Sequence, residues 1–107
     1  MKRRKISEIR WENFHSAACL LDAAYYVYRA VCVESSIAVE IAEKELDAAW
    51  KAWSVGQWRQ MREHADLALN EIRDALAAAD RVETLKGAFT EILEQAVSNI
   101  ETAIRKG

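Results

Sequence analysis

Apolar residues recur along the chain at alternating spacings of three and four, a heptad pattern that begins at Trp11. Only Ser35 interrupts this first apolar stripe in one half of the chain, and only Lys86 interrupts it in the other. A period of 3.5 residues sustained over about six heptads per half is typical of packed helices and not of strands. The positions are Trp11, Phe14, Ala18, Leu21, Tyr25, Tyr28, Cys32, Ser35, Val39, Ala42, Leu46, Ala49 and Trp53, then Trp58, Met61, Ala65, Ala68, Ile72, Ala75, Ala79, Val82, Lys86, Phe89, Leu93, Ala96, Ile100 and Ala103.

A second apolar stripe runs beside the first in the N-terminal half. It comprises Ala17, Leu20, Ala24, Val27, Val31, Ala38, Ile41 and Ala48. A helix with two adjacent apolar stripes has to be covered on two sides, which one partner helix cannot do. We therefore expect either that each half of the chain folds back into two shorter helices or that two chains pair.

Three interruptions indicate where helices end. The pattern stops around Gly56, which suits the left-handed residue that often follows a helix. Ser35, Ser36 and Thr84 carry hydroxyls that can satisfy the free backbone N–H groups at a helix start. Breaks at these places predict an all-α four-helix bundle with helices at about 7–33, 36–53, 57–83 and 85–105. The alternative is a long two-helix hairpin that dimerises.

Length and charge suggest one helical domain at 7–107 behind a basic N-terminal arm at 1–6. The arm holds Lys2, Arg3, Arg4 and Lys5, whereas the whole chain of 107 residues has a net charge of −2. No apolar run approaches the roughly 20 residues of a membrane-spanning helix, and the basic start lacks the apolar stretch of a signal peptide. We therefore expect a cytoplasmic protein with no membrane partner.

The sequence offers no readable catalytic group. It has no Gly-rich phosphate loop, and no Ser or Cys stands in a pattern that supplies it with a base. Cys19 and Cys32 belong to no Cys-x-x-Cys pair, so we expect reduced thiols. These observations predict no cofactor and favour a role without catalysis.

Trp50, Trp53 and Trp58 crowd the predicted turn in the middle of the chain. Trp53 and Trp58 lie on the first apolar stripe, where core packing is expected, whereas Trp50 lies beside it. Tryptophans that stay exposed are frequent anchors in protein interfaces. We therefore predict that these three residues, and Trp50 above all, form a partner-binding surface.

Residues 56–69 resemble the turn and second helix of a tetratricopeptide repeat. Gly56 is followed by an aromatic residue, Trp58, and then by small residues at helical spacing that end in Ala68-Leu69. The resemblance implies a tight helix–turn–helix and, for the family, peptide binding in a groove.

A second resemblance suggests an enzyme. Glu40-x-x-Glu43 and Glu71-x-x-Asp74 resemble the metal-binding pattern of MazG-type all-α nucleoside triphosphate pyrophosphatases. The resemblance implies Mg²⁺ held by four carboxylates, bridging phosphate oxygens and activating water. Relative to the apolar stripes, however, the acids of the two motifs lie on edges that an antiparallel helix pair does not bring together.

The favoured hypothesis is therefore a non-catalytic protein-interaction module, such as a small helical adaptor, inhibitor or assembly factor. It would bind a protein partner through a helical face or the tryptophan-rich turn, and it could also form a homodimer. The Mg²⁺-dependent pyrophosphatase is the second hypothesis. Contact with nucleic acid through the basic arm is the third.

Overall fold

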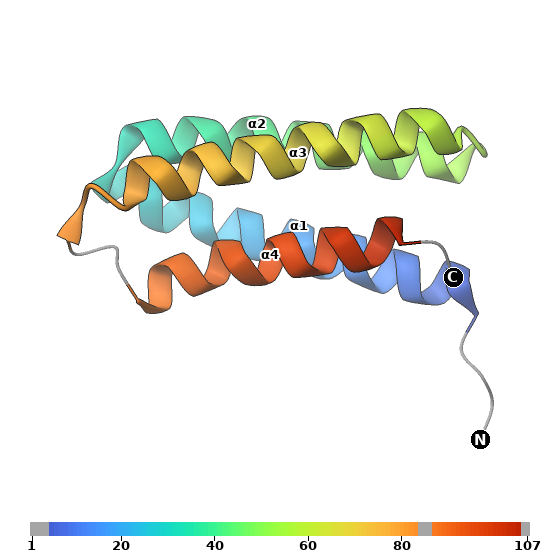
Figure 1. The fold of residues 1–107 in the computed structure, drawn as a ribbon, viewed down its shortest axis with the longest axis horizontal. Coiled ribbons are helices and arrows are strands. Elements are labelled where there is room, and N and C mark those ends of the chain that lie inside the picture. The colour runs from blue at the N-terminus through green and yellow to red at the C-terminus, as the bar shows by residue number, and fades with distance from the viewer. Residues whose placement is uncertain (1–4, 84–86, 106–107) are drawn as a thin grey trace, which may run out of the picture.

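The heptad pattern forms four antiparallel helices in the computed structural model, which describes residues 5–83 and 87–105. Within these residues the helices are α1 (Ile6–Val31), α2 (Val33–Ser54), α3 (Trp58–Ala79) and α4 (Ala88–Ile104). They alternate in direction, so the start of α1, the α2–α3 turn and the end of α4 lie at the same end of the bundle (Figure 1). The predicted all-α four-helix bundle is confirmed, and the single chain does not form the long hairpin.

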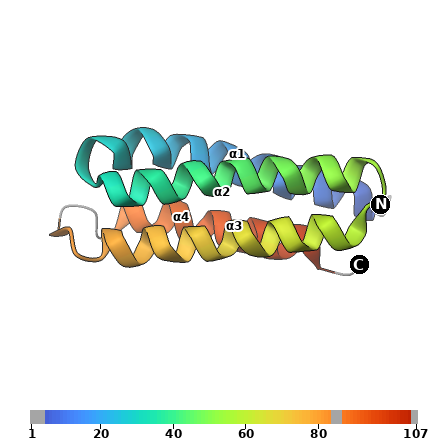
Figure 2. The ribbon, with the colours of Figure 1, turned by 90° about the horizontal axis from the view of Figure 1, so that it is seen from above.

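The four helices pack as two close pairs. α2 makes its most extensive contacts with α3, and α1 makes its most extensive contacts with α4. Figure 2 shows α1 and α2 on one side of the bundle and α3 and α4 on the other. The buried positions of α2 and α3 are mostly alanines, so their backbones can approach closely. The larger buried side chains of α1 and α4 include Phe14, Leu21, Tyr28, Leu93 and Ile100.

Ser35 is a core residue and does not mark a helix start. Its side chain is fully buried in α2, and its Oγ donates a hydrogen bond to the carbonyl oxygen of Ala75 in α3 at 2.7 Å. The link between α1 and α2 is instead the extended residue Cys32. Ser36 also lies inside α2, where its Oγ donates to the Val33 carbonyl. The predicted break was thus near the correct place, but the hydroxyl of Ser35 serves packing between helices and not capping.

The second apolar stripe is covered only in part by the chain itself. Its alanines at 17, 24 and 38 are buried, and Leu20 and Val27 are half-buried. Val31 and Ile41 remain 48% and 39% exposed, respectively. The folding back of the helices therefore covers the inner part of this stripe and leaves its outer edge in solvent.

Two glycines with positive φ flank the second half of the fold. Gly56 has φ +77° and follows α2, as predicted. Gly87 has φ +84° and precedes α4, which begins one residue later. α3 ends at Ala79, before the predicted boundary at 83. The predicted helix start at Thr84 and the side chains of Lys86 and Phe89 lie outside the described residues.

Candidate functional site

The four tryptophans of the chain gather at one end of the bundle, which we call the tryptophan end. Trp11 lies near the start of α1, Trp50 and Trp53 lie near the end of α2, and Trp58 begins α3. The ring centroids of Trp50 and Trp53 are 4.9 Å apart, and those of Trp11 and Trp50 are 6.4 Å apart in an edge-to-face arrangement. The alternating directions of the helices therefore bring together aromatic residues that are distant in sequence.

These tryptophans differ in burial. Trp50 and Trp53 are half-buried, and the Trp53 ring lies 6.5 Å from that of the buried Phe14. Trp11 and Trp58 are 46% and 55% exposed although both lie on the first apolar stripe. The stripe places these two side chains toward the core, but they stand near the end of the bundle, where it covers them incompletely.

Arg10 ties the tryptophan end to the last turn of α4. Its Nε donates a hydrogen bond to the carbonyl oxygen of Ala103 at 2.7 Å, and its guanidinium carbon lies 5.3 Å from the centroid of the Trp58 ring. Burial lowers the pKa of the Arg10 guanidinium from its ordinary value. One side chain of α1 thus contacts both α3 and α4.

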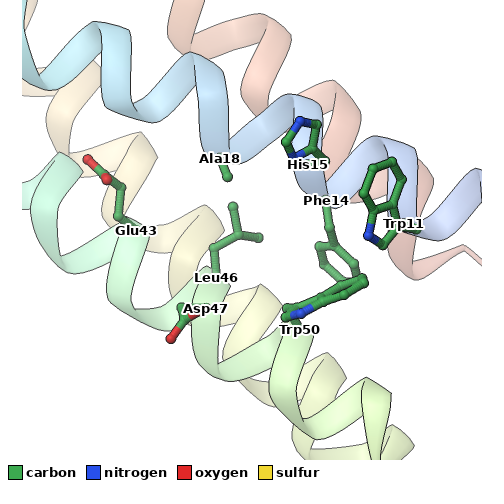
Figure 3. Close-up of a pocket in the computed structure, with 8 residues that line it drawn as sticks. All are labelled: Trp11, Phe14, His15, Ala18, Glu43, Leu46, Asp47 and Trp50. Carbon is green, nitrogen blue, oxygen red and sulfur yellow. The ribbon is translucent and has the colours of Figure 1, made fainter.

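A pocket of about 410 Å³, which we call the aromatic groove, opens between α1 and α2 beside the tryptophans. The groove is lined by Trp11, Phe14, His15, Ala18, Glu43, Leu46, Asp47 and Trp50. Figure 3 shows the aromatic rings at one end of the groove, Glu43 at the other, and Ala18 and Leu46 between them. The groove is therefore aromatic at one end and acidic at the other, with an apolar middle that Asp47 borders on one side.

Glu43 dominates the electrostatics of the acidic end. Burial raises the pKa of Glu43, and repulsion from Asp22 and Glu40 raises it further. Asp47 is paired with Lys51 at 2.8 Å, and Glu40 is paired with Lys44 at 3.5 Å. Glu43 takes part in none of the salt bridges between described residues. Among the residues that the structure describes, its negative charge is therefore left without a salt-bridge partner.

A second, smaller hollow lies on another side of Trp11. It has a volume of about 360 Å³ and is lined by Ser7, Glu8, Trp11, Glu12 and Trp53. In both hollows every charged lining residue among the described positions is acidic, apart from the histidine at 15. The exposed indole of Trp11 is therefore flanked by negative charge.

The acids of the pyrophosphatase hypothesis are not assembled into a metal site. Glu40 and Glu43 lie on α2, and Glu71 and Asp74 lie on α3. Among the described residues, no group of three or more His, Cys, Asp and Glu side chains could hold a metal ion. The same residues also contain no helix long and apolar enough to cross a membrane.

The basic arm is described only at its end. Lys5 is exposed and immediately precedes α1, whereas Lys2, Arg3 and Arg4 lie outside the described residues. Contact of the arm with nucleic acid therefore stays a prediction.

The segment that resembles a tetratricopeptide repeat forms part of the α2–α3 turn and the first half of α3. Gly56 adopts the left-handed conformation of the turn, and Ala65, Ala68 and Leu69 are buried. Comparison of the whole chain with protein-family models, with curated proteins and with solved structures found no match.

Sequence reasoning did not find the contribution of α1 to this site. Trp11 was recognised only as the start of the heptad pattern, and neither Arg10 nor His15 was assigned a role. No local signal identifies them, because their contacts with α2, α3 and α4 depend on how the helices pack.

Proposed function

We propose that this protein is a non-catalytic protein-interaction module that binds a protein partner through its tryptophan end. The observation that carries the proposal is the exposure of two large indoles at the tryptophan end, Trp11 at 46% and Trp58 at 55%, of which Trp11 lines the aromatic groove. Exposed tryptophan next to a concave pocket is the composition typical of the anchor residues of interfaces.

The neighbours of these indoles also support the proposal. The His15 ring stacks on Trp11 with a centroid distance of 5.0 Å and an interplanar angle of 7°. Arg10 contacts the Trp58 ring and is itself held by the end of α4. Contacts of this kind restrict side-chain motion before binding, which lowers the entropy lost when a partner binds.

Affinity capture with matched variants tests the proposal. The bait is the full chain, used as wild type, as Trp11→Ala/Trp58→Ala, and as the control Tyr26→Ala. Tyr26 is 59% exposed on α1 and lines neither hollow of the tryptophan end.

A partner that binds at the tryptophan end should lose about 30-fold or more in affinity with the double variant, because interface anchors contribute about 2 kcal/mol or more. It should bind the Tyr26 variant normally. Equal binding of every partner to the double variant and the wild type would contradict the proposal.

We place this role in the cytoplasm and keep self-association as a separate prediction. On the outer face of α2, Val33, Ile37 and Ile41 are exposed at spacings of four residues. Sedimentation equilibrium decides between a monomer and a homodimer. If a dimer forms, Ile37→Lys should dissociate it, because a charge in an apolar interface loses its hydration.

The pyrophosphatase hypothesis predicts a different result. Nucleoside triphosphate hydrolysis that requires Mg²⁺ and disappears in Glu43→Gln would show that the protein is an enzyme and would overturn the proposed function. The described residues contain no group of three or more His, Cys, Asp and Glu side chains that could hold a metal ion, which does not favour that outcome.

A further inference from the structure

The aromatic groove combines three features that suit one kind of ligand. Its aromatic end presents the indoles of Trp11 and Trp50, its middle is formed by Ala18 and Leu46, and its far end carries the carboxylate of Glu43 (Figure 3). Lysine and arginine side chains match this order, because their apolar stem suits the middle of the groove and their cationic tip suits the carboxylate at its far end.

We propose that the aromatic groove receives an arginine side chain of the protein partner. The guanidinium pairs with Glu43, the aliphatic stem lies over Ala18 and Leu46, and the adjoining part of the partner packs against Trp11 and Trp50. This inference rests on the proposed function, since it names the chemistry that the tryptophan end recognises.

Charge complementarity supports a cation in this groove. Glu43 and Asp47 line it, and no lysine or arginine among the described residues does. Lys51 is paired with Asp47 at 2.8 Å, whereas Glu43 has no salt-bridge partner among the described residues and is open to an incoming cation. An anionic ligand would face the carboxylate directly, and a purely apolar ligand would bury it further without a partner.

The raised pKa of Glu43 supports the same assignment. Its carboxylate loses hydration through burial and is repelled by the nearby Asp22 and Glu40. A bound cation would relieve both effects. Titratable groups with such shifts in a concave site are frequent in functional sites, where they are retained although they reduce stability.

Arginine fits better than lysine for geometric reasons. The planar guanidinium can donate two parallel hydrogen bonds to a carboxylate such as that of Glu43. An ammonium group is more strongly hydrated, so it loses more on entering a partly buried groove. A metal ion would need several oxygen ligands, and the described residues contain no such cluster.

A titration with two small probes tests the proposal on the ¹⁵N-labelled full chain. The probes are N-acetyl-arginine methylamide and N-acetyl-citrulline methylamide, which have nearly the same shape but differ in charge. The indole N–H signals of the four tryptophans report binding by nuclear magnetic resonance. We expect the arginine compound to shift the Trp11 and Trp50 signals saturably, and the citrulline compound to leave them unchanged at the same concentration.

Two variants assign the effect to the acidic end. Glu43→Gln should weaken binding of the arginine compound by about fivefold or more, because the charge of the carboxylate is lost. Glu71→Gln is the matched control: Glu71 is also half-buried in a helix, α3, but does not line the groove, and its variant should bind normally. Thermal melts of both variants establish that each is folded.

The proposal is overturned if the arginine compound gives no saturable shift, if citrulline binds equally well, or if Glu71→Gln weakens binding as much as Glu43→Gln. These outcomes are separate from the fate of the proposed function. A partner that depends on Trp11 and Trp58 while the arginine compound fails to bind removes only the arginine assignment. Arginine binding that depends on Glu43, without any partner that depends on the tryptophans, removes the proposed function.

Discussion

The contact between α2 and α3 and the tryptophan end differ in how completely their polar and aromatic side chains are buried and paired. Between α2 and α3 the buried residues are mostly alanines, and the buried hydroxyl of Ser35 donates to the Ala75 carbonyl. At the tryptophan end two indoles are about half exposed, and at the far end of the aromatic groove the half-buried Glu43 forms no salt bridge with any described residue. Folding alone accounts for the first region, whereas the second keeps features that a stable bundle does not need. Such features are expected where a protein binds something else.

The largest change in the free energy of unfolding is expected for a substitution in the buried core of the bundle. Ile72 is fully buried in α3, so Ile72→Ala should reduce the free energy of unfolding by about 2–5 kcal/mol through lost burial and the cavity left behind. Leu67→Ala on the same helix, at a side chain that is 48% exposed, should change it far less. Chemical denaturation measures both. Similar losses for the two variants would contradict the arrangement of the core.

Replacing the tryptophans by alanine should reduce stability by amounts that follow their burial. Trp53 contacts Phe14 and Trp50, so Trp53→Ala should cost about 3 kcal/mol, near the lower limit for buried aromatic side chains. Trp58→Ala should cost about 0.5 kcal/mol or less, as is usual for exposed positions. Trp50→Ala should fall between them, because Trp50 is half-buried. Thermal melts rank the three, and a Trp58 effect as large as that of Trp53 would show that Trp58 serves the fold.

Ser35→Ala tests the polar contact inside the α2–α3 pair. The variant loses a buried hydrogen bond of 2.7 Å and should be about 1 kcal/mol less stable. The control is Ser54→Ala, whose exposed hydroxyl donates a bond of the same length to Lys51 within its own helix. Because water can replace that bond, the control should be nearly neutral. Denaturation midpoints that do not separate the two variants would argue against a role of Ser35 in joining the helices.

The smallest expected change in stability is a gain, whereas the preceding substitutions all reduce stability. The pKa of Glu43 is raised in the folded protein, so the native state holds this proton more tightly than the unfolded state. The stabilising effect of the proton is present below the ordinary carboxyl pKa and is lost as the pH rises through the raised folded value. At neutral pH, Glu43→Gln should therefore raise the melting temperature by about 1–3 °C, as expected for a change at a partly exposed site.

The gain in Glu43→Gln should disappear below about pH 4, where the wild-type side chain is protonated in both states. Melts at both pH values measure it. A lower melting temperature of the variant at neutral pH would mean that the charged carboxylate stabilises the fold, which contradicts an uncompensated charge.

The alternating spacing of apolar residues was sufficient to predict the helical class and most buried positions, whereas the division into four helices also needed the break signals near Ser35, Gly56 and Thr84. Each side chain takes its direction from its own helix, so a periodic pattern identifies the buried face without knowledge of the partner. Ser35 is an example, because it lies on the first apolar stripe and is buried although it is polar. Its polarity was misread as a helix start because the acceptor, Ala75, is 40 positions away in the chain.

The candidate site depended on tertiary structure. Trp50 could be named from the sequence, but its contact with Trp11 and the groove that it borders arise only when α1 lies against α2. The contact of Arg10 with Ala103 spans 93 positions, and the burial and the repulsion from Asp22 that raise the pKa of Glu43 arise only when α1 packs against α2. Helical periodicity is a local property, so it can be recognised from the sequence alone. Contacts between helices depend on the order and crossing of whole elements, and only the folded chain decides them.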